Sequence, residues 1–245
     1  MINTLTTAHK CGDVIGLALR QLMDAPCVTR ILVADGPHTD HKQYGVLVDE
    51  PPVKAVVDGL ASDKIVYEYT DYCATVGVKC NRVLRDVSPD CEWLLVVDSD
   101  EVYHEDALAR LAAWLTTAEY DRYSIKTVDP INDFYHYFAM PDRKPRLYRW
   151  LAGSRCNNGW EGQQWIEHSG QRLCPGGAWN GCGQVPDDVC EFYHMNALRS
   201  SGRIQALPDG TVNWSGGGRS YNCKVEPLAR ERIPRSVLRL GRQTL

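Results

Sequence analysis

The chain has 245 residues and a formal net charge of −4 at pH 7, with 44% hydrophobic and 24% charged residues. This composition is too apolar and too weakly charged for a disordered chain, and the acidic balance excludes a protein that is basic overall and binds nucleic acid by charge alone. No apolar run approaches the ~20 residues that span a bilayer, and the N-terminus lacks a basic stretch followed by an apolar one. We therefore expect a soluble cytoplasmic protein without a signal peptide.

The first half of the sequence alternates predicted strands and helices. Apolar runs of strand length occur at 2–7, 30–34, 64–69 and 92–97, and helices are predicted at 14–23, 75–87 and 104–118. This alternation is typical of a mostly parallel, Rossmann-like sheet flanked by helices, so the predicted class is α/β. In such sheets ligands bind at the carboxyl ends of the strands, where the loops begin.

The second half of the sequence has a different character. After about residue 128 it is rich in Trp, Gly and Asn, with brief predicted strands at 145–150 and 163–168. We expect residues 128–227 to be irregular, to fold onto the same sheet as residues 1–127, and to form the far wall of a cleft.

The C-terminal end of the chain is basic. Residues 196–245 carry nine Lys or Arg against three acidic residues, a net charge of +6, which leaves −10 on residues 1–195. We predict that 228–245 is a basic arm that binds an anionic partner. The alternative is that Val237, Leu238 and Leu240 dock on the core and the arm is structural.

The ten cysteines do not form a recognisable metal motif, because no pair is spaced as Cys-x-x-Cys. Buried free thiols are the favoured interpretation. A structural metal or a disulfide among Cys156, Cys174, Cys182 and Cys190 is the alternative.

The strongest candidate site follows the apolar run 92–97, where the chain reads Asp98-Ser99-Asp100-Glu101. A buried strand that ends in two carboxylates at i and i+2 directs both into one loop. Mg²⁺ and Mn²⁺ commonly bind one or two such carboxylates together with substrate phosphates. The alternative is a solvated acidic turn that caps the helix beginning near His104.

A second candidate site follows the apolar run 30–34, which ends in Asp35-Gly36. Glycine allows a tight turn and the close approach of a ligand, and Asp35 could accept hydrogen bonds from a nucleobase or a ribose. An ordinary turn at a strand end explains the same residues.

Taken in order, these segments resemble a family 2 glycosyltransferase of the GT-A fold. The resemblance covers roughly residues 2–127 and rests on the first strand ending at Thr6-Thr7, the Ala34-Asp35-Gly36…Thr39-Asp40 turn, Gly77-x-Lys79-x-Asn81, and Asp98-Ser99-Asp100-Glu101. The opening strand lacks the Pro-x-Tyr-Asn often seen in the family, and the turn at Asp35 has one acidic residue fewer. The absence of Gln-x-x-Arg-Trp argues against a processive polysaccharide synthase.

The resemblance implies an inverting transferase that uses Mn²⁺ or Mg²⁺ and moves a sugar from a nucleotide-diphosphate sugar, with a UDP-sugar as the expected donor, to a hydroxyl acceptor. Thr7 and Asp35 would hold the nucleoside, with Lys79 and Asn81 near it. Asp98 and Asp100 would hold the ribose and the metal ion on the diphosphate.

Patches of the second half resemble other parts of the family. Arg146-Leu147-Tyr148-Arg149 followed by Trp165-Ile166-Glu167-His168 is similar to an Arg-Leu-Phe-Arg…Val-His-Glu arrangement, and Glu191-Phe192-Tyr193-His194 is similar to a late strand that contains histidine. His194 would be a further metal ligand; an ordinary, partly buried histidine is the alternative.

For catalysis, Glu167 is the expected base for the attacking hydroxyl, with Glu161 and Asp142 in reserve, and Asp100 acts through the metal ion. The acceptor stays open among a lipid-linked glycan, a membrane surface and hydroxymethylated DNA. The rival functions are a nucleotidyltransferase on a similar sheet and a catalytically silent nucleotide-sugar-binding protein.

Overall fold

The structure is a computed structural model of the chain. It describes residues 1–9, 11–12, 14–37, 52–71, 73–130, 136–138, 143–158, 164–175, 181–195, 204–206, 212–216, 219–223, 225–227, 230–235 and 237.

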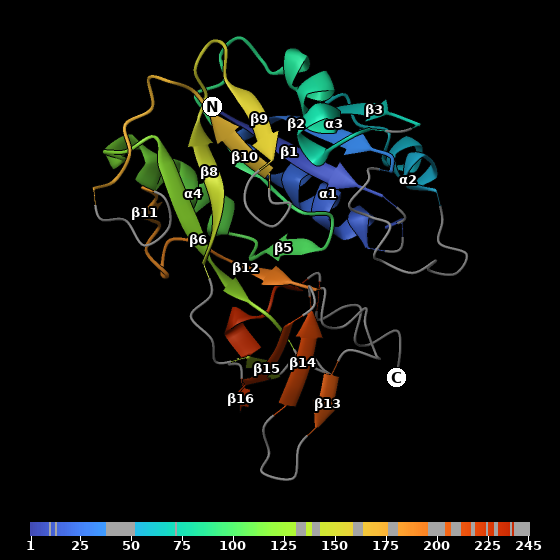
Figure 1. The fold of residues 1–245 in the computed structure, drawn as a ribbon, viewed down its shortest axis with the longest axis vertical. Coiled ribbons are helices and arrows are strands. Elements are labelled where there is room, and N and C mark those ends of the chain that lie inside the picture. Colours follow the sequence, from blue (N-terminus) through green and yellow to red (C-terminus); the bar gives the residue numbers. More distant parts are fainter. Residues whose placement is uncertain are drawn as a thin grey trace.

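The first half of the chain builds the parallel part of the central sheet (Figure 1). The order β3-β2-β1-β4 is parallel throughout, and the bounds are β1 Ile2–Ala8, β2 Val28–Asp35, β3 Ile65–Tyr69 and β4 Trp93–Val96. These bounds confirm the strands predicted at 2–7, 30–34, 64–69 and 92–97. Because the strands are parallel, their carboxyl ends lie at one edge of the sheet.

Later segments of the chain complete this sheet. The additional strands are β5 Glu101–Tyr103, β6 Arg122–Val128, β8 Arg143–Arg149, β11 Gly183–Gln184 and β12 Glu191–His194. β8 runs antiparallel between β4 and β6, β12 pairs parallel with β6 and antiparallel with β5, and β11 pairs parallel with β6. Within the described residues this gives a nine-stranded sheet whose parallel pairings outnumber the antiparallel ones. The predicted α/β class with a mostly parallel sheet is confirmed.

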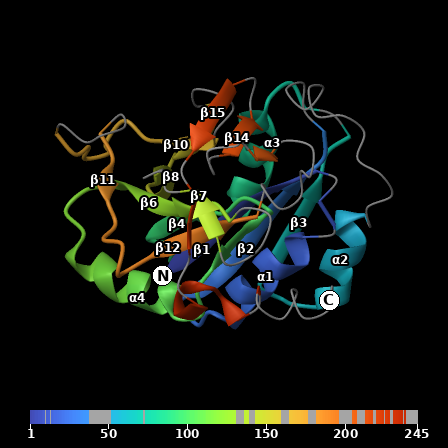
Figure 2. The same cartoon turned by 90° about the horizontal axis from the view of Figure 1, so that it is seen from below.

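Helices cover both faces of the sheet (Figure 2). One face carries α1 Ile15–Asp24, α2 Val53–Leu60 and α4 Ala107–Trp114, and the other carries α3 Val76–Val83 with the hairpin of β9 Arg155–Asn158 and β10 Gln164–Glu167. Successive strand residues alternate between the two layers: Ile31 packs with α1, and Leu32 packs with α3. Short 3₁₀ turns, η2 Leu84–Asp86 and η3 Leu115–Thr117, extend α3 and α4 to nearly the predicted ends. The helix α2 was not predicted.

Smaller antiparallel sheets lie outside the central one. β13 Ile204–Ala206, β14 Val212–Gly216 and β15 Arg219–Cys223 pair in sequence, and β16 Val225–Pro227 pairs with β7 His136–Phe138.

The first part of the predicted C-terminal arm docks on the core, after a 3₁₀ turn, η5, at Arg230–Arg232. Ile233 and Val237 are 1% and 0% exposed and pack with the apolar side chains of β5 and β12. Arg232 forms a bidentate ion pair with Glu191, with Nε to Oε1 at 3.0 Å and Nη2 to Oε2 at 2.7 Å. These contacts favour the structural interpretation for this part of the arm; Leu238 and Leu240 lie outside the described residues.

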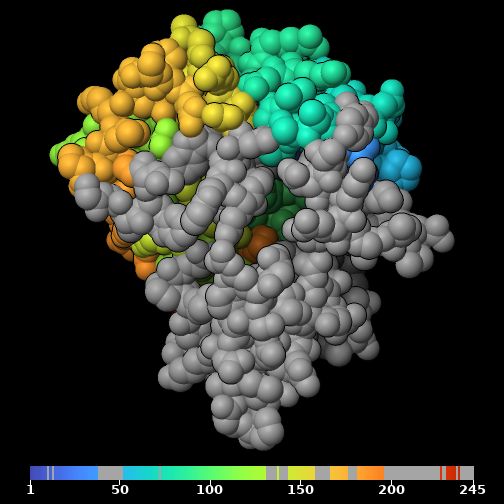
Figure 3. Space-filling view, in the orientation of Figure 1, coloured from blue at the N-terminus to red at the C-terminus, as the bar shows by residue number. Residues whose placement is uncertain are grey.

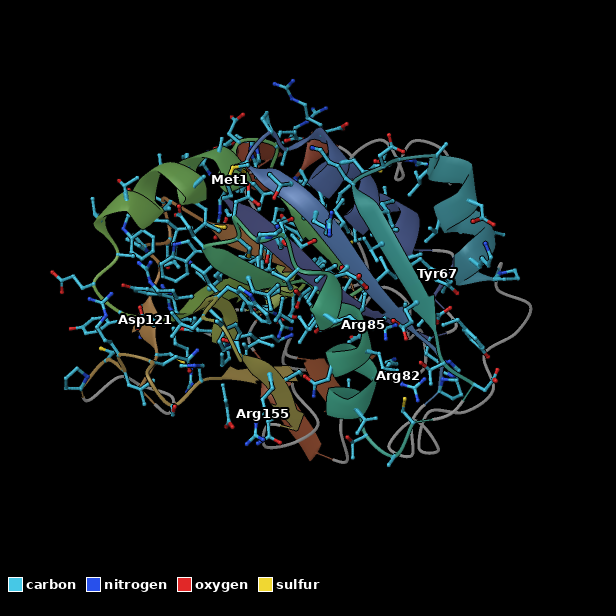
Figure 4. All side chains as sticks on the ribbon, turned by 90° about the horizontal axis from the view of Figure 1, so that it is seen from above. Met1, Tyr67, Arg82, Arg85, Asp121 and Arg155 are labelled. Carbon is cyan, nitrogen blue, oxygen red and sulfur yellow. The ribbon has the colours of Figure 1, made fainter. Side chains whose placement is uncertain are left out.

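An ion-pair cluster centres on the buried carboxylate of Asp121, just before β6. Asp121 accepts hydrogen bonds from the backbone N of Arg172 at 2.8 Å and from its Nη2 at 3.1 Å, and Arg149 Nε lies 2.9 Å from Oδ1. Burial alone would raise the pKa of Asp121, but the hydrogen bonds and charges of the two arginines hold it below its usual value. Figure 4 shows Asp121 and Tyr67 of β3 on opposite sides of the molecule.

The structure also bears on two predictions made from the sequence, which concern membrane-spanning helices and the state of the cysteines. Among the described residues, no helix combines the length and the apolar character that crossing a bilayer requires. None of the cysteines whose side chains the structure describes is in a disulfide, and most of them are buried. Burial raises the pKa of the Cys91 thiol to about 11 and that of Cys182 to about 12.

Candidate functional site

The predicted nucleoside and metal residues gather at the carboxyl edge of the parallel strands. Thr7 pairs with Ala34, and Ala8 with Asp35, across β1 and β2. On the other side of β1, Val97 N donates to Leu5 O at 2.9 Å, so Asp98 follows immediately at the same edge. In Figure 3, the turquoise surface of α3 lies beside the yellow surface of β9.

The turn after β2 depends on glycine. Gly36 has a φ of +118°, and a Cβ at this position would lie 2.0 Å from the carbonyl oxygen of Thr70. The carboxylate of Asp35 is 6% exposed; its Oδ1 accepts a hydrogen bond from Gly36 N, and its Oδ2 accepts one from the Tyr67 hydroxyl, both at 2.7 Å. The expected tight turn is present, and the role of Asp35 towards a nucleoside stays a prediction.

Lys79 and Asn81 of α3 have hydrogen bonds to backbone groups around the site. The Lys79 ammonium is buried and donates to Ala8 O and Gly36 O, both at 3.0 Å, so it ties the ends of β1 and β2 together. Burial lowers the pKa of Lys79. The Asn81 amide donates to Cys156 O and accepts from Cys156 N, both at 2.8 Å, and so joins α3 to β9. Their contacts with a nucleotide stay predictions.

The acidic turn between β4 and β5 is organised by an arginine for which the sequence analysis gave no role. Arg146 of β8 donates from Nη2 to Asp98 Oδ2 at 2.5 Å and to Glu101 Oε1 at 2.6 Å, and from Nε to both Glu101 oxygens at 3.1 Å. Glu101 Oε2 also accepts from Asp98 N at 3.1 Å. Burial acts to raise the pKa of Asp98, but the charge of Arg146 outweighs it and the pKa is lowered.

His194 of β12 lies beside Asp100 because β12 pairs with β5. His194 is the register partner of Glu101, and Met195 N donates to Asp100 O at 2.8 Å. As a result His194 Nε2 lies 3.8 Å from Asp100 Oδ1. Asp100 and His194 are far apart in the sequence, and the pairing of β5 with β12 brings them together.

The other ring nitrogen of His194 faces two further charged groups. Nδ1 lies 2.7 Å from Asp129 Oδ1 and 3.2 Å from Lys144 Nζ. Burial and the Lys144 ammonium oppose a charge on the imidazole, but Asp100 and Asp129 outweigh them and raise the pKa of His194. Neither Asp129 nor Lys144 was named from the sequence; the apolar pattern around them carries no signal that they meet His194.

The chemistry of this pair fits a divalent cation only in part. Within the described residues, no group of three or more His, Cys, Asp or Glu side chains is arranged to hold a metal ion. Asp100 Oδ1 and His194 Nε2 are 3.8 Å apart, whereas adjacent ligands of an octahedral Mg²⁺ or Mn²⁺ with bonds of about 2.1 Å lie about 3 Å apart, so both side chains reach one ion only if one of them moves by roughly 1 Å. An Asp129–His194 hydrogen bond through Nδ1 leaves Nε2 as the ligand atom. After such a movement the pair would supply two ligands to a cation whose other positions are filled by phosphate oxygens and water. One oxygen of Asp98 is engaged by Arg146, and Asp98 as a ligand stays a prediction.

The side chain expected to act as base lies on the hairpin packed against α3. Glu167, at the end of β10, is half-buried, and its Oε2 accepts a hydrogen bond from Asn157 Nδ2 of β9 at 3.1 Å. Glu161 and Asp142 lie outside the described residues. The assignment of the base stays a prediction.

An amide of α1 holds the short strand β5 in place on its open side. Gln21 donates from Nε2 to Glu101 O at 2.9 Å, and its Oε1 accepts from Tyr103 N at 2.5 Å. These are the hydrogen bonds that a further strand would otherwise make.

Comparisons with known proteins give similarity to solved structures only. No family model and no curated protein matches the sequence. The solved structures include residues 1–349 of TarS from S. aureus, with 17% identity, a TM-score of 0.42, and 60% of this chain and 46% of that one covered. They also include glucosyl-3-phosphoglycerate synthase from Mycobacterium tuberculosis in complex with Mn²⁺, uridine diphosphate and phosphoglyceric acid, with 18% identity, a TM-score of 0.36, and 53% and 43% covered.

A third similar structure is 4-diphosphocytidyl-2C-methyl-D-erythritol synthase from Anaerococcus prevotii, with 14% identity, a TM-score of 0.38, and 61% and 70% covered. The match to the TarS fragment spans less than half of that fragment's length. All three TM-scores lie below 0.5, so the function has to be inferred from the side chains of this chain.

Proposed function

We propose that the chain is a metal-dependent inverting glycosyltransferase of the GT-A type. It moves a sugar from a nucleotide-diphosphate sugar, with a UDP-sugar as the expected donor, to a hydroxyl acceptor. The observation that supports this most directly is the pairing of β5 with β12, which brings Asp100 and His194 together beside Asp98 at the carboxyl edge of the parallel strands. This edge is the usual ligand-binding edge of such sheets.

The residues of the candidate site have different roles in this proposal, according to their chemistry. A bound Mn²⁺ or Mg²⁺ would neutralise the leaving diphosphate, which is the main chemical demand of this reaction. Asp100 and His194 would hold that ion, and Asp129 would orient the His194 ring through Nδ1. Asp98 accepts hydrogen bonds from the donor's hydroxyl groups, and Thr7 and Asp35 line the nucleoside end.

The acceptor side carries the general base. We assign the base to Glu167, because a carboxylate within hydrogen-bond reach of the attacking hydroxyl takes its proton during a single displacement. The Asn157 amide holds that carboxylate on the hairpin. The acceptor itself stays open between a lipid-linked glycan and DNA with a hydroxymethylated base.

The experiment is a thermal-shift series with UDP, GDP, CDP and dTDP, each with and without Mn²⁺. We expect one diphosphate to stabilise the protein in a metal-dependent way, since a ligand at 100 times its Kd adds about 2.7 kcal/mol to stability. Asp100→Asn should abolish the metal-dependent part of the shift, and Asp63→Asn, an exposed acid near the start of β3, is the matched control.

Three results would contradict the proposal. No stabilisation by any diphosphate would favour a protein without this activity, and release of pyrophosphate from a nucleoside triphosphate would indicate the nucleotidyltransferase. An unchanged metal-dependent shift in Asp100→Asn would remove the assigned metal site.

A further inference from the structure

The guanidinium of Arg146 is buried between two carboxylates that differ in their access to solvent. Arg146 is 2% exposed, and the side chains that it contacts are 0% exposed for Glu101 and 29% exposed for Asp98. Arg146 also lies over the ring of Phe192 in β12, with its central carbon 5.7 Å from the ring centroid. The Phe192 ring and Glu101 together fix the plane of the guanidinium. The orientation of Nη2, which donates to Asp98, is therefore fixed as well.

The charges of the cluster explain why an arginine is needed here. Asp98 and Glu101 are adjacent carboxylates in an apolar environment, and without a cation between them their mutual repulsion would favour protonation of one. One guanidinium leaves the triad with a net charge of −1. The two carboxylates therefore have different roles: the buried Glu101 anchors Arg146, and the partly exposed Asp98 is available to a ligand.

We propose that Arg146 is the positioning residue of the candidate site: anchored by Glu101, it holds the Asp98 carboxylate in the orientation that meets a nucleoside-diphosphate ligand. This inference rests on the proposed function. Arg146 does not touch the ligand, and its effect passes through Asp98.

A purely structural role for the same triad makes a different prediction. Removing one member of a buried ion pair leaves an unpaired charge and destabilises a protein whatever its function, so Arg146→Met alone is uninformative. Replacing both members by neutral side chains is often close to neutral for stability. The double variant Arg146→Met/Glu101→Gln removes one positive and one negative charge, so it keeps the net charge of the site while Asp98 loses its partner.

The experiment measures the Kd for the diphosphate that stabilises the wild type, by calorimetry with saturating Mn²⁺, together with the melting temperature. We expect the double variant to bind at least about tenfold more weakly, as is typical for the loss of a residue that orients a ligand-binding group. Glu101→Gln alone removes the anchoring charge but keeps Arg146 beside Asp98, so its affinity should lie between those of wild type and the double variant. Arg149→Met is the matched control, because Arg149 lies on the same strand but pairs with Asp121.

The outcomes are distinct. Binding of the double variant within threefold of wild type overturns the role of Arg146. If the double variant does not fold, Arg146→Lys decides: lysine keeps the charge but lacks the fork that holds two carboxylates, so wild-type affinity in Arg146→Lys refutes the proposal and weaker binding by a folded protein supports it. A wild-type protein that binds none of the four diphosphates refutes the proposed function, and the role of Arg146 falls with it.

Discussion

The docking of the C-terminal segment can be tested at Ile233. This side chain is 1% exposed and packs with Val102, Tyr193 and Met195 behind the strand that carries His194. Ile233→Ala removes three buried carbons and leaves a cavity, for which the usual cost is about 2–5 kcal/mol. For a chain of this size each kcal/mol lowers the melting temperature by about 2–4 °C, so a loss of about 3 kcal/mol corresponds to a decrease of about 6–12 °C.

The measurement is thermal and urea unfolding followed by circular dichroism. The control is Arg235→Ala on the same turn, whose side chain is exposed and whose removal should change the free energy of unfolding by no more than about 0.5 kcal/mol. The stabilisation by a nucleoside diphosphate should be the same in Ile233→Ala as in wild type, because the substituted side chain lies behind the site. A change of less than 0.5 kcal/mol in Ile233→Ala would show that the segment does not dock.

Three further predictions concern other parts of the chain. Glu167→Gln should keep donor binding and lose transfer, because an amide cannot accept the proton; normal turnover beside normal affinity would assign the base elsewhere. Asp121→Asn should lower the free energy of unfolding by roughly 1–3 kcal/mol at pH 7. The pKa of Asp121 is lowered in the folded state, so its contribution is present above the unfolded pKa of about 4 and is lost as pH falls through the folded value; a difference from wild type in urea unfolding that does not shrink between pH 6 and pH 3 would contradict this. Gly36→Ala should destabilise the protein by about 3 kcal/mol or more, because the new Cβ would meet the Thr70 carbonyl and φ is +118°; a wild-type melting temperature would refute it.

Much of the scaffold was predictable because its signals are local. Apolar runs of strand length and apolar residues at helical spacing placed β1 to β4 and three of the four α-helices that the structure describes, since each pattern depends on neighbours a few residues apart. The same local pattern located Asp35 and Asp98 at the ends of buried strands, and parallel pairing then put both at one edge of the sheet. The helix α2 was missed; it is short, and only Val53 among its residues is buried.

The contacts that give the site its chemistry were decided by tertiary structure. Arg146 meets Asp98 across 48 residues, and His194 meets Asp129 across 65, because β8 pairs with β4 and β12 pairs with β5 and β6. No local periodicity encodes which strands become neighbours. The sequence alone could therefore name carboxylates suited to a cation, but it could not show that a buried arginine engages one of them and that a histidine stands beside another. These contacts follow from the order of the strands in the sheet. The order is set by the burial of apolar side chains on both faces, and it brings polar residues that are distant in the sequence to one edge.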